Sequence, residues 1–107
     1  MEIKQYEIVL VNLNPTIGSE MKKTRPCVVI SPDEMNAHLR TITIAPVTST
    51  SKEYPTRVKL SQKELKGWIV LDQIRTINRI RIVKLLGKLT EKEITETKNV
   101  LKEIFVD

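Results

Sequence analysis

The sequence predicts a mainly β fold of the α+β class: a small, twisted, mostly antiparallel barrel with short helices and one C-terminal helix. The first reason is length, since 107 residues have room for one domain, 1–107, with one modest core. The second is a series of short strand-like segments at roughly even spacing, and the third is one strong helical pattern near the end of the sequence. The sequence contains no repeat, linker or low-complexity tract.

The strand-like segments are of two kinds. They cover residues 6–13, 27–31, 41–45, 57–60, 68–71 and 79–84. The first, second and fifth are continuously apolar, which indicates strands buried on both faces. The other three alternate polar and apolar side chains, as half-buried strands do.

Turn signals separate these segments. Pro32 ends the second segment before a short helical turn over residues 33–37. Pro46 ends the third segment before a Ser/Thr-rich loop over residues 47–55, and Gly67 closes the turn before the fifth.

The C-terminal helix is the best-defined element. Thr90 and Glu93 have the spacing of a capping box, in which each side chain bonds the backbone N–H of the other residue. Apolar residues then recur at near-helical spacing: Ile94, Val100, Leu101, Ile104 and Phe105. This stripe predicts a helix that packs on the core and closes one mouth of the barrel.

Composition excludes several classes of protein. A hydrophobic content of 40% with 29% charged residues is typical of soluble globular chains, and the longest apolar runs are too short to span a bilayer. Residues 1–4 do not begin a signal peptide, so we expect a cytoplasmic protein without membrane contact. The single cysteine, Cys27, lies in a β-branched run, where burial in the core is expected rather than nucleophilic chemistry.

Charge and ligand content narrow the chemistry further. Lysine and arginine number 18 against 13 acids, and residues 73–90 carry five bases and no acid, which favours a polyanionic partner. The one histidine, His38, is expected at the surface. With one histidine, one cysteine and no cluster of acids, neither a metal site nor a nucleophile triad is expected, and no cofactor motif is present.

Two stretches bring polar side chains to the end of a strand. Residues 14–31 form a charged loop that turns at Gly18 and leads into a strand, and Pro26 holds Arg25 extended at its threshold. Residues 72–76 follow the fifth strand directly.

These polar groups suit one reaction, cleavage of RNA by its own 2′-hydroxyl. The substrate supplies the nucleophile, so the protein has to orient the phosphate and stabilise its charge, which arginine and threonine can do. Because arginine stays protonated, Arg25 is a poor general base. The residues alone indicate a possible RNA-binding barrel and leave cleavage open.

Four motifs lie in order along the chain. They are Val11–Glu20, Lys23–Pro32, Ile44–Thr50 and Leu71–Thr76. In sequence and spacing they resemble the MazF/PemK (Kid) toxins of bacterial type II toxin–antitoxin pairs, and the resemblance covers nearly the whole chain.

The resemblance implies an SH3-like barrel of the CcdB/MazF type and a homodimer. It also implies a metal-independent mRNA interferase, an endoribonuclease that cuts single-stranded RNA at short sequence motifs and leaves 2′,3′-cyclic phosphate and 5′-hydroxyl ends. A cognate MazE-like antitoxin with an acidic flexible tail would occupy the RNA groove and neutralise the toxin, consistent with the net charge of +5.

By motif position, the resemblance also assigns site residues. Arg25 matches the family's catalytic arginine, expected to stabilise the transition state, and Thr48 its catalytic threonine, expected to bond the scissile phosphate. Residues expected to contact the substrate are Glu20, Lys23, Ser49, Asp72, Gln73 and Arg75. The general base stays open between Glu20, a water and a substrate phosphate.

Structural roles compete with some of these assignments. Arg25 could instead pair with Glu20 or Asp72, and Arg75 could serve the dimer interface rather than RNA. Trp68 is expected in the core or at the dimer interface rather than beneath a base.

The chain departs from the family pattern, and two other functions stay open. Ser19 and Val70 stand where some members have a histidine and an arginine, so that variant site is absent. A gyrase poison of the related CcdB type would end in Trp-Gly-Ile, whereas this sequence ends in Ile104–Asp107. A non-catalytic RNA-binding barrel would bind RNA in a salt-dependent way and form no cyclic phosphate.

Overall fold

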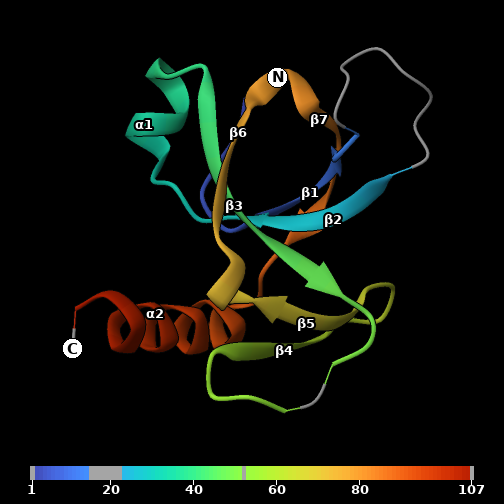
Figure 1. The fold of residues 1–107 in the computed structure, drawn as a ribbon, viewed down its shortest axis with the longest axis vertical. Coiled ribbons are helices and arrows are strands. Elements are labelled where there is room, and N and C mark those ends of the chain that lie inside the picture. The colour runs from blue at the N-terminus through green and yellow to red at the C-terminus, as the bar shows by residue number, and fades with distance from the viewer. Residues whose placement is uncertain (1, 15–22, 52, 107) are drawn as a thin grey trace.

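The computed structural model describes residues 2–14, 23–51 and 53–106 (Figure 1). The strands are β1 (Glu7–Asn12), β2 (Thr24–Val29), β3 (Thr41–Thr48), β4 (Arg57–Ser61), β5 (Lys66–Val70), β6 (Arg75–Asn78) and β7 (Ile82–Lys88). The α-helices are α1 (Asp33–His38) and α2 (Glu91–Phe105), and two short 3₁₀ helices cover Leu71–Gln73 and Arg79–Arg81.

The strands form one curled antiparallel sheet. Its order is β4-β5-β3-β2-β1-β7, with β6 also paired to β3, and each of these pairs is antiparallel. The predicted mainly β, antiparallel fold with a C-terminal helix is therefore confirmed. Closure is not: β4 and β7 are the two ends of the pairing path among the described strands, so the barrel is open.

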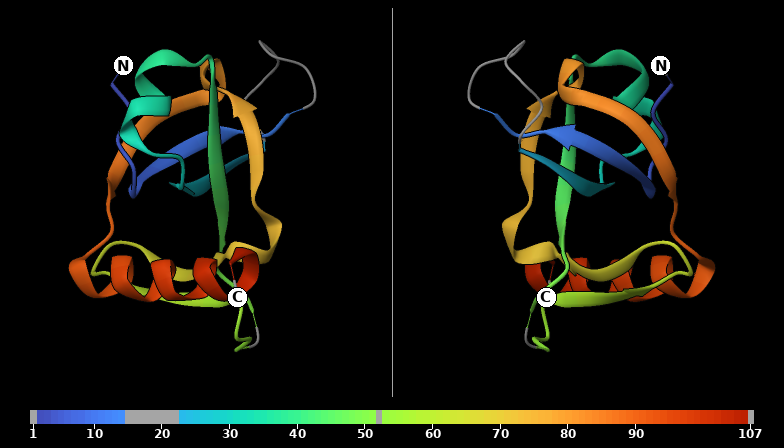
Figure 2. Two further views of the ribbon diagram at one scale, coloured as in Figure 1. Left: turned by 90° about the vertical axis from the view of Figure 1, so that its left-hand side faces the viewer. Right: turned by 90° about the vertical axis from the view of Figure 1, so that its right-hand side faces the viewer.

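The molecule has two layers, which the side views separate (Figure 2). One layer is the curled part made by β1, β2, β6, β7 and the first half of β3. The other contains β4 and β5, with α2 packed alongside them. No helix among the described residues is long and apolar enough to cross a membrane.

Strand β3 connects the two layers because it changes partner along its length. One of its edges pairs with β6 over Thr41–Ile44 and then with β5 over Val47–Thr48. Pro46 lies between the segment of β3 that pairs with β6 and the segment that pairs with β5, so its missing N–H interrupts neither of these two ladders. The prediction that Pro46 ends the strand was therefore wrong, and β3 continues to Thr48.

Two hydrophobic clusters make up the core, one on each face of the central strands. In β1, Ile8 belongs to the first cluster, and its neighbours Val9 and Val11 belong to the second. This arrangement confirms that the first predicted strand is apolar on both faces, because alternate residues of a strand point to opposite sides.

The C-terminal helix packs as its stripe predicts. Ile94, Val100, Leu101 and Ile104 pack against the first cluster, whereas Phe105 at the helix end is 66% exposed and falls outside the stripe. The capping box is present: the Thr90 hydroxyl accepts from the Glu93 N–H (3.2 Å), and the Glu93 carboxylate accepts from the Thr90 N–H (2.9 Å).

The sequence mispredicted the segment after β5. Strand β6 was missed because only Ile77 of its four residues is buried, too short a pattern to identify. The predicted strand 79–84 instead begins with a 3₁₀ helix, and β7 runs over Ile82–Lys88. The helix is held by the Asn78 side chain, which accepts from the Ile80 N–H (3.0 Å).

Candidate phosphate-binding site at the open edge of β2

Arg25 and Thr48 lie where β2 and β3 separate. The two strands pair through Val29↔Ile44, Val28↔Ala45 and Cys27↔Pro46, and the pairing stops there. Arg25 precedes the last paired residue of β2 by two positions, and Thr48 follows the last paired residue of β3 by two, so alternation along each strand puts both on the face that carries Cys27 and Pro46. The site-like position predicted for Arg25 therefore lies on the same face of the sheet as the predicted threonine, at the open end of a ladder.

The first three residues of β2 form an edge on the side that faces β3. They pair with β1, where Arg25 is opposite Val11 and Pro26 opposite Leu10, and β3 joins only from Cys27 onward. An edge is where proline is tolerated, because no partner strand requires its N–H there. Pro26 therefore stiffens the strand beneath an exposed Arg25 without disrupting the sheet.

Arg75 points to the same face of the sheet. It pairs with Ile44 across β3 and β6, and Ile44 belongs with Cys27 to the second core cluster, from which Arg25 continues along β2. Burial raises the pKa of the Cys27 thiol to about 12, and the charges of Arg25 and Arg75 oppose that rise. The strand registers put both arginines on the face of the sheet that carries Cys27.

Cys27 itself is part of the core. Its side chain is fully buried in the second cluster, as predicted, and its raised pKa keeps the thiol protonated at neutral pH.

The Thr48 hydroxyl is fixed by the turn that follows β3. It donates to the carbonyl oxygen of Thr50 (3.1 Å), and the Thr50 N–H points back to it (3.4 Å). A hydroxyl oxygen accepts more than one bond, and Thr48 is only half-buried. The hydroxyl is thus held at the end of β3 and stays accessible from solvent.

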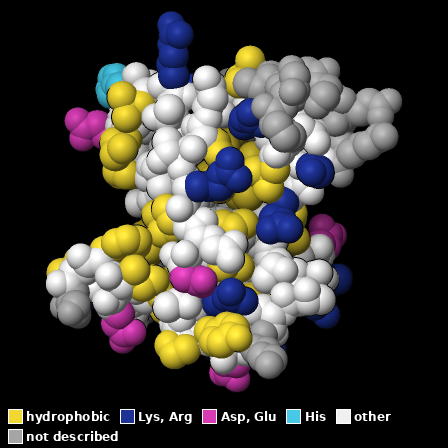
Figure 3. All heavy atoms as spheres, viewed as in Figure 1, with side chains coloured by type: hydrophobic (Ala, Val, Ile, Leu, Met, Phe, Trp, Pro, Cys, Tyr) yellow, Lys and Arg dark blue, Asp and Glu magenta, His cyan; other side chains and the backbone are white. Residues whose placement is uncertain are grey.

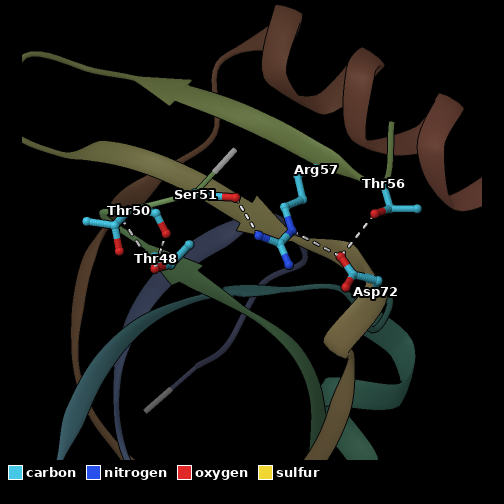
Figure 4. A network of polar contacts seen from close by, with 6 residues as sticks. All are labelled: Thr48, Thr50, Ser51, Thr56, Arg57 and Asp72. Atoms are coloured by element: carbon cyan, nitrogen blue, oxygen red, sulfur yellow. Dashed lines mark hydrogen bonds and ion pairs between the residues drawn. The ribbon is translucent and has the colours of Figure 1, made fainter. Parts of the chain in front are cut away.

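A polar network links this turn to the end of β5 (Figure 4). Arg57 donates to the Ser51 hydroxyl and pairs through Nε with the Asp72 carboxylate at 3.4 Å, while Thr56 donates to the same carboxylate oxygen at 3.1 Å. The Arg57 guanidinium also lies over the Tyr54 ring, 4.8 Å from its centroid. Arg57 therefore contacts the loop between β3 and β4 near its start, at Ser51, and near its end, at Tyr54.

Asp72 is consequently a structural anion in this state. Burial raises its pKa, but the hydrogen bonds from Arg57 and Thr56 outweigh that effect, so the pKa is lowered and the group is a carboxylate at neutral pH. Its partner is Arg57 and not Arg25, which answers one of the structural alternatives for Arg25.

Sequence reasoning missed Arg57. The alternation of residues 57–60 indicated a base facing solvent, yet only 18% of the Arg57 side chain is exposed. What brings Arg57 to Asp72 is the pairing of β4 with β5, in which Arg57 is opposite Val70, two residues before Asp72. This pairing cannot be read from the sequence.

The other predicted residues are arranged less tightly. Lys23 and Ser49 are exposed beside β2 and after β3, and Gln73 is exposed at the end of the 3₁₀ helix that leads into β6. Glu20 lies outside the described residues. The structure thus brings Arg25, Thr48 and Arg75 to one face, and it connects Asp72 to Thr48 through the Arg57 network.

Basic side chains gather on this side of the molecule. In the view of Figure 1, Lys and Arg side chains cluster near the middle of the face, with apolar atoms between them (Figure 3). Among the described residues, no three His, Cys, Asp or Glu side chains are grouped to hold a metal ion. The described part of this face thus presents lysine, arginine and hydroxyl side chains to a ligand.

Fold and site together define a small antiparallel β-protein whose exposed arginines and a fixed threonine hydroxyl are suited to bind a phosphate. The family model of the PemK-like, MazF-like toxins of type II toxin–antitoxin systems matches residues 4–105, and the chain belongs to this family. The resemblance seen in the four sequence motifs is confirmed.

Individual relatives agree with this assignment. Endoribonuclease MazF of Staphylococcus epidermidis is 32% identical over 105 residues, which cover 92% of this chain and 88% of that protein. The MazE–MazF crystal structure (Form-III) from Deinococcus radiodurans superposes with a TM-score of 0.83 at 25% identity, over 97% of this chain and 96% of that one. A mycobacterial endoribonuclease in complex with its cognate antitoxin has the same fold, with a TM-score of 0.82 at 19% identity over 94% and 92% of the two chains.

Proposed function

We propose that this chain, as one domain over residues 1–107, is a sequence-specific, metal-independent endoribonuclease toxin. It cleaves single-stranded RNA to 2′,3′-cyclic phosphate and 5′-hydroxyl ends. The endoribonuclease activity follows the curated relative named Endoribonuclease MazF, at 32% identity. The observation that carries the proposal is that strand pairing and alternation put Arg25, Thr48 and Arg75 on one face of the sheet, where β2 and β3 separate.

The reaction has three parts that the protein has to assist. The 2′-oxygen attacks the adjacent phosphorus as its proton leaves to a base, the bond from phosphorus to the 5′-oxygen breaks, and that oxygen takes up a proton. Arg25 binds the non-bridging oxygens, where negative charge builds up, and Thr48 donates a hydrogen bond to the same phosphate. Arg25 or water protonates the leaving oxygen.

Other residues hold the RNA in place. Lys23, Ser49, Gln73 and Arg75 are exposed around the site and contact the strand on either side of the scissile phosphate. Asp72 acts indirectly, through Arg57, on the turn that fixes Thr48. Glu20 is a candidate for the general base, together with a water or a substrate phosphate.

Metal independence is supported by the residues themselves. The substrate supplies the nucleophile, the phosphate charge is met by guanidinium groups, and ligands for zinc are scarce, with one histidine and one cysteine in the chain. The acids of the described residues form no cluster with these or with one another that could hold a metal ion.

The partner is a cognate MazE-like antitoxin with an acidic, flexible tail. Solved structures of relatives include MazE–MazF and an endoribonuclease in complex with its cognate antitoxin, and a tail of negative charge would compete with RNA for the same basic face. The toxin acts as a homodimer in the cytoplasm, where its RNA substrate is found.

Incubation of the protein with single-stranded RNA in excess chelator tests the main point. Cleavage with cyclic-phosphate ends is expected to continue, and a requirement for divalent metal would refute the mechanism. Arg25→Ala should reduce kcat by at least a hundredfold, since one preorganised charge-stabilising donor typically contributes about that much.

Arg40→Ala is the matched control for Arg25→Ala. Arg40 is exposed at the opposite end of β3 from Thr48, roughly 25 Å along the strand, and its loss should leave cleavage unchanged. Salt-dependent RNA binding without any cyclic-phosphate product would favour the non-catalytic barrel instead, and inhibition of gyrase would favour the CcdB-type poison.

A further inference from the structure

The hairpin of β4 and β5 packs one face into the core and directs the other face outward. Val58, Leu60 and Ile69 point into the first core cluster, against which α2 packs. Because side chains alternate along a strand, Arg57 and Lys59 of β4 and Trp68 of β5 belong to the opposite face. The sequence analysis placed Trp68 in the core or at the dimer interface. The core position is not confirmed, since Trp68 is half-buried and belongs to neither core cluster, and the interface position stays a prediction.

Trp68 stands in one row with the site. The register pairs Thr48 with Trp68 across β3 and β5, and Trp68 with Lys59 across β5 and β4. Directly paired residues have Cβ atoms about 5 Å apart on one face of a sheet. The row thus runs from Thr48, the proposed catalytic threonine, to the indole and then to a lysine.

Two surface pockets meet at this indole. One, of about 590 Å³, is lined by Tyr54, Arg57, Lys59 and Trp68, and the other, of about 580 Å³, shares Lys59 and Trp68 and adds Ser49 and Lys66. The first pocket also carries Glu53 and Glu96, whereas the described residues that line the second include two lysines and no acid. An anionic strand that leaves Thr48 would therefore run through the second pocket.

We propose that Trp68 is the stacking platform for a base of the RNA next to the scissile phosphate, and that Lys59 and Lys66 bind the phosphates that flank that base. This inference rests on the proposed ribonuclease function and adds to it a substrate-binding subsite on the β4–β5 hairpin. Aromatic residues make up only 4% of the chain, so a single indole flanked by lysines is a distinctive feature of this surface. A base stacks on an indole irrespective of its sequence, and lysines attract its phosphates.

The chain has one tryptophan, so its fluorescence reports on this position alone. The probe is a single-stranded oligoribonucleotide that the wild-type protein cuts, resynthesised with 2′-O-methyl ribose so that it cannot be cut. Titration with this oligonucleotide is expected to quench the fluorescence of Trp68 saturably. Trp68→Ala should weaken its binding, measured by fluorescence anisotropy, roughly tenfold, and Trp68→Phe should weaken it less.

Lysine variants test the electrostatic part. Lys59→Gln should lower the slope of log affinity against log salt concentration by about 0.7, the value for one phosphate contact to a single strand. Lys63→Gln removes the same charge from an exposed turn position outside both pockets, and it should leave that slope and the affinity unchanged.

The outcomes separate this subsite from the proposed function. If the wild-type protein cuts RNA but its fluorescence does not respond, and Trp68→Phe and Trp68→Ala bind the probe as tightly as wild type, the stacking subsite is wrong and the ribonuclease stands. If the wild-type protein cuts no RNA, both fail. Far-UV circular dichroism of each variant shows whether it is folded, and Trp68→Phe keeps the test available if Trp68→Ala unfolds.

Discussion

Replacing Arg57 by methionine should loosen the turn that carries the candidate catalytic threonine. Arg57 holds three groups: the Ser51 hydroxyl, the Asp72 carboxylate at 3.4 Å and the Tyr54 ring at 4.8 Å. Methionine keeps the apolar stem of the side chain but removes these contacts. The protein should fold normally, unfold more easily, and lose turnover more than substrate affinity, because Ser51 lies next to the Thr50 backbone that bonds Thr48.

The magnitude follows from the exposure of each partner. Tyr54 is 46% exposed, so its ring contributes about 0.5 kcal/mol, and the hydrogen bond to Ser51 contributes about 1 kcal/mol. The Asp72 side chain is 37% exposed, so solvent screening limits the ion pair to about 0.5 kcal/mol. The total of about 2 kcal/mol should lower the Tm by roughly 10 °C in a domain of this size.

Thermal unfolding followed by circular dichroism, from neutral to acid pH, measures this loss. Arg57 and Thr56 hold the pKa of Asp72 below its ordinary value of about 3.9, against the opposing effect of burial. A lowered pKa contributes stability above the unfolded-state pKa and loses it as the pH falls through the folded-state value. The deficit of Arg57→Met should therefore be largest at neutral pH and shrink below about pH 4.

A double-mutant cycle with Asp72→Asn isolates the ion pair. The coupling energy between the two positions should be about 0.5 kcal/mol, with Lys63→Gln as an unrelated charge change that couples to neither. An Arg57→Met protein with wild-type Tm and wild-type kcat would refute the reasoning, since the network would then contribute neither to stability nor to turnover.

Three further predictions concern residues that support the site. Gly67→Ala should destabilise the protein and slow RNA cleavage, because the new Cβ would lie 2.5 Å from the carbonyl oxygen of Thr48 and push β5 from β3; wild-type thermal stability and turnover would contradict this. Glu93→Ala should lower the free energy of unfolding by about 1–2 kcal/mol, measured by chemical denaturation, because it removes the capping box and leaves the Ser61 N–H without its carboxylate partner. The control Glu91→Ala changes an exposed residue at the start of α2 and should lower it much less. Cys27, whose pKa is raised from 9.0 to about 12, should react with iodoacetamide at pH 8 roughly a thousandfold more slowly in the folded protein than after unfolding, and rapid labelling of the native protein would show that the core opens there.

Local patterns were enough to predict much of the fold. The capping box at Thr90 and Glu93 depends on residues three apart, and the apolar run of β1 depends on neighbours, so both can be read from the sequence. The four motifs likewise identified the family, because their order and spacing are properties of the chain itself. Strand β6 and the extension of β3 through Pro46 were not predictable, since both depend on which strand lies alongside.

The sequence by itself determined the fold class, the family, and the residue types that can meet a phosphate. Only the tertiary structure decided which of them share a face or meet: the β2–β3 register puts Arg25 on the face of Thr48, the β4–β5 register brings Arg57 to Asp72, and the β3–β5 register sets Trp68 opposite Thr48. The physical reason is that pairing between strands joins residues far apart in the chain. A shift of one residue would turn each of these side chains to the other face of the sheet, so local composition cannot specify them.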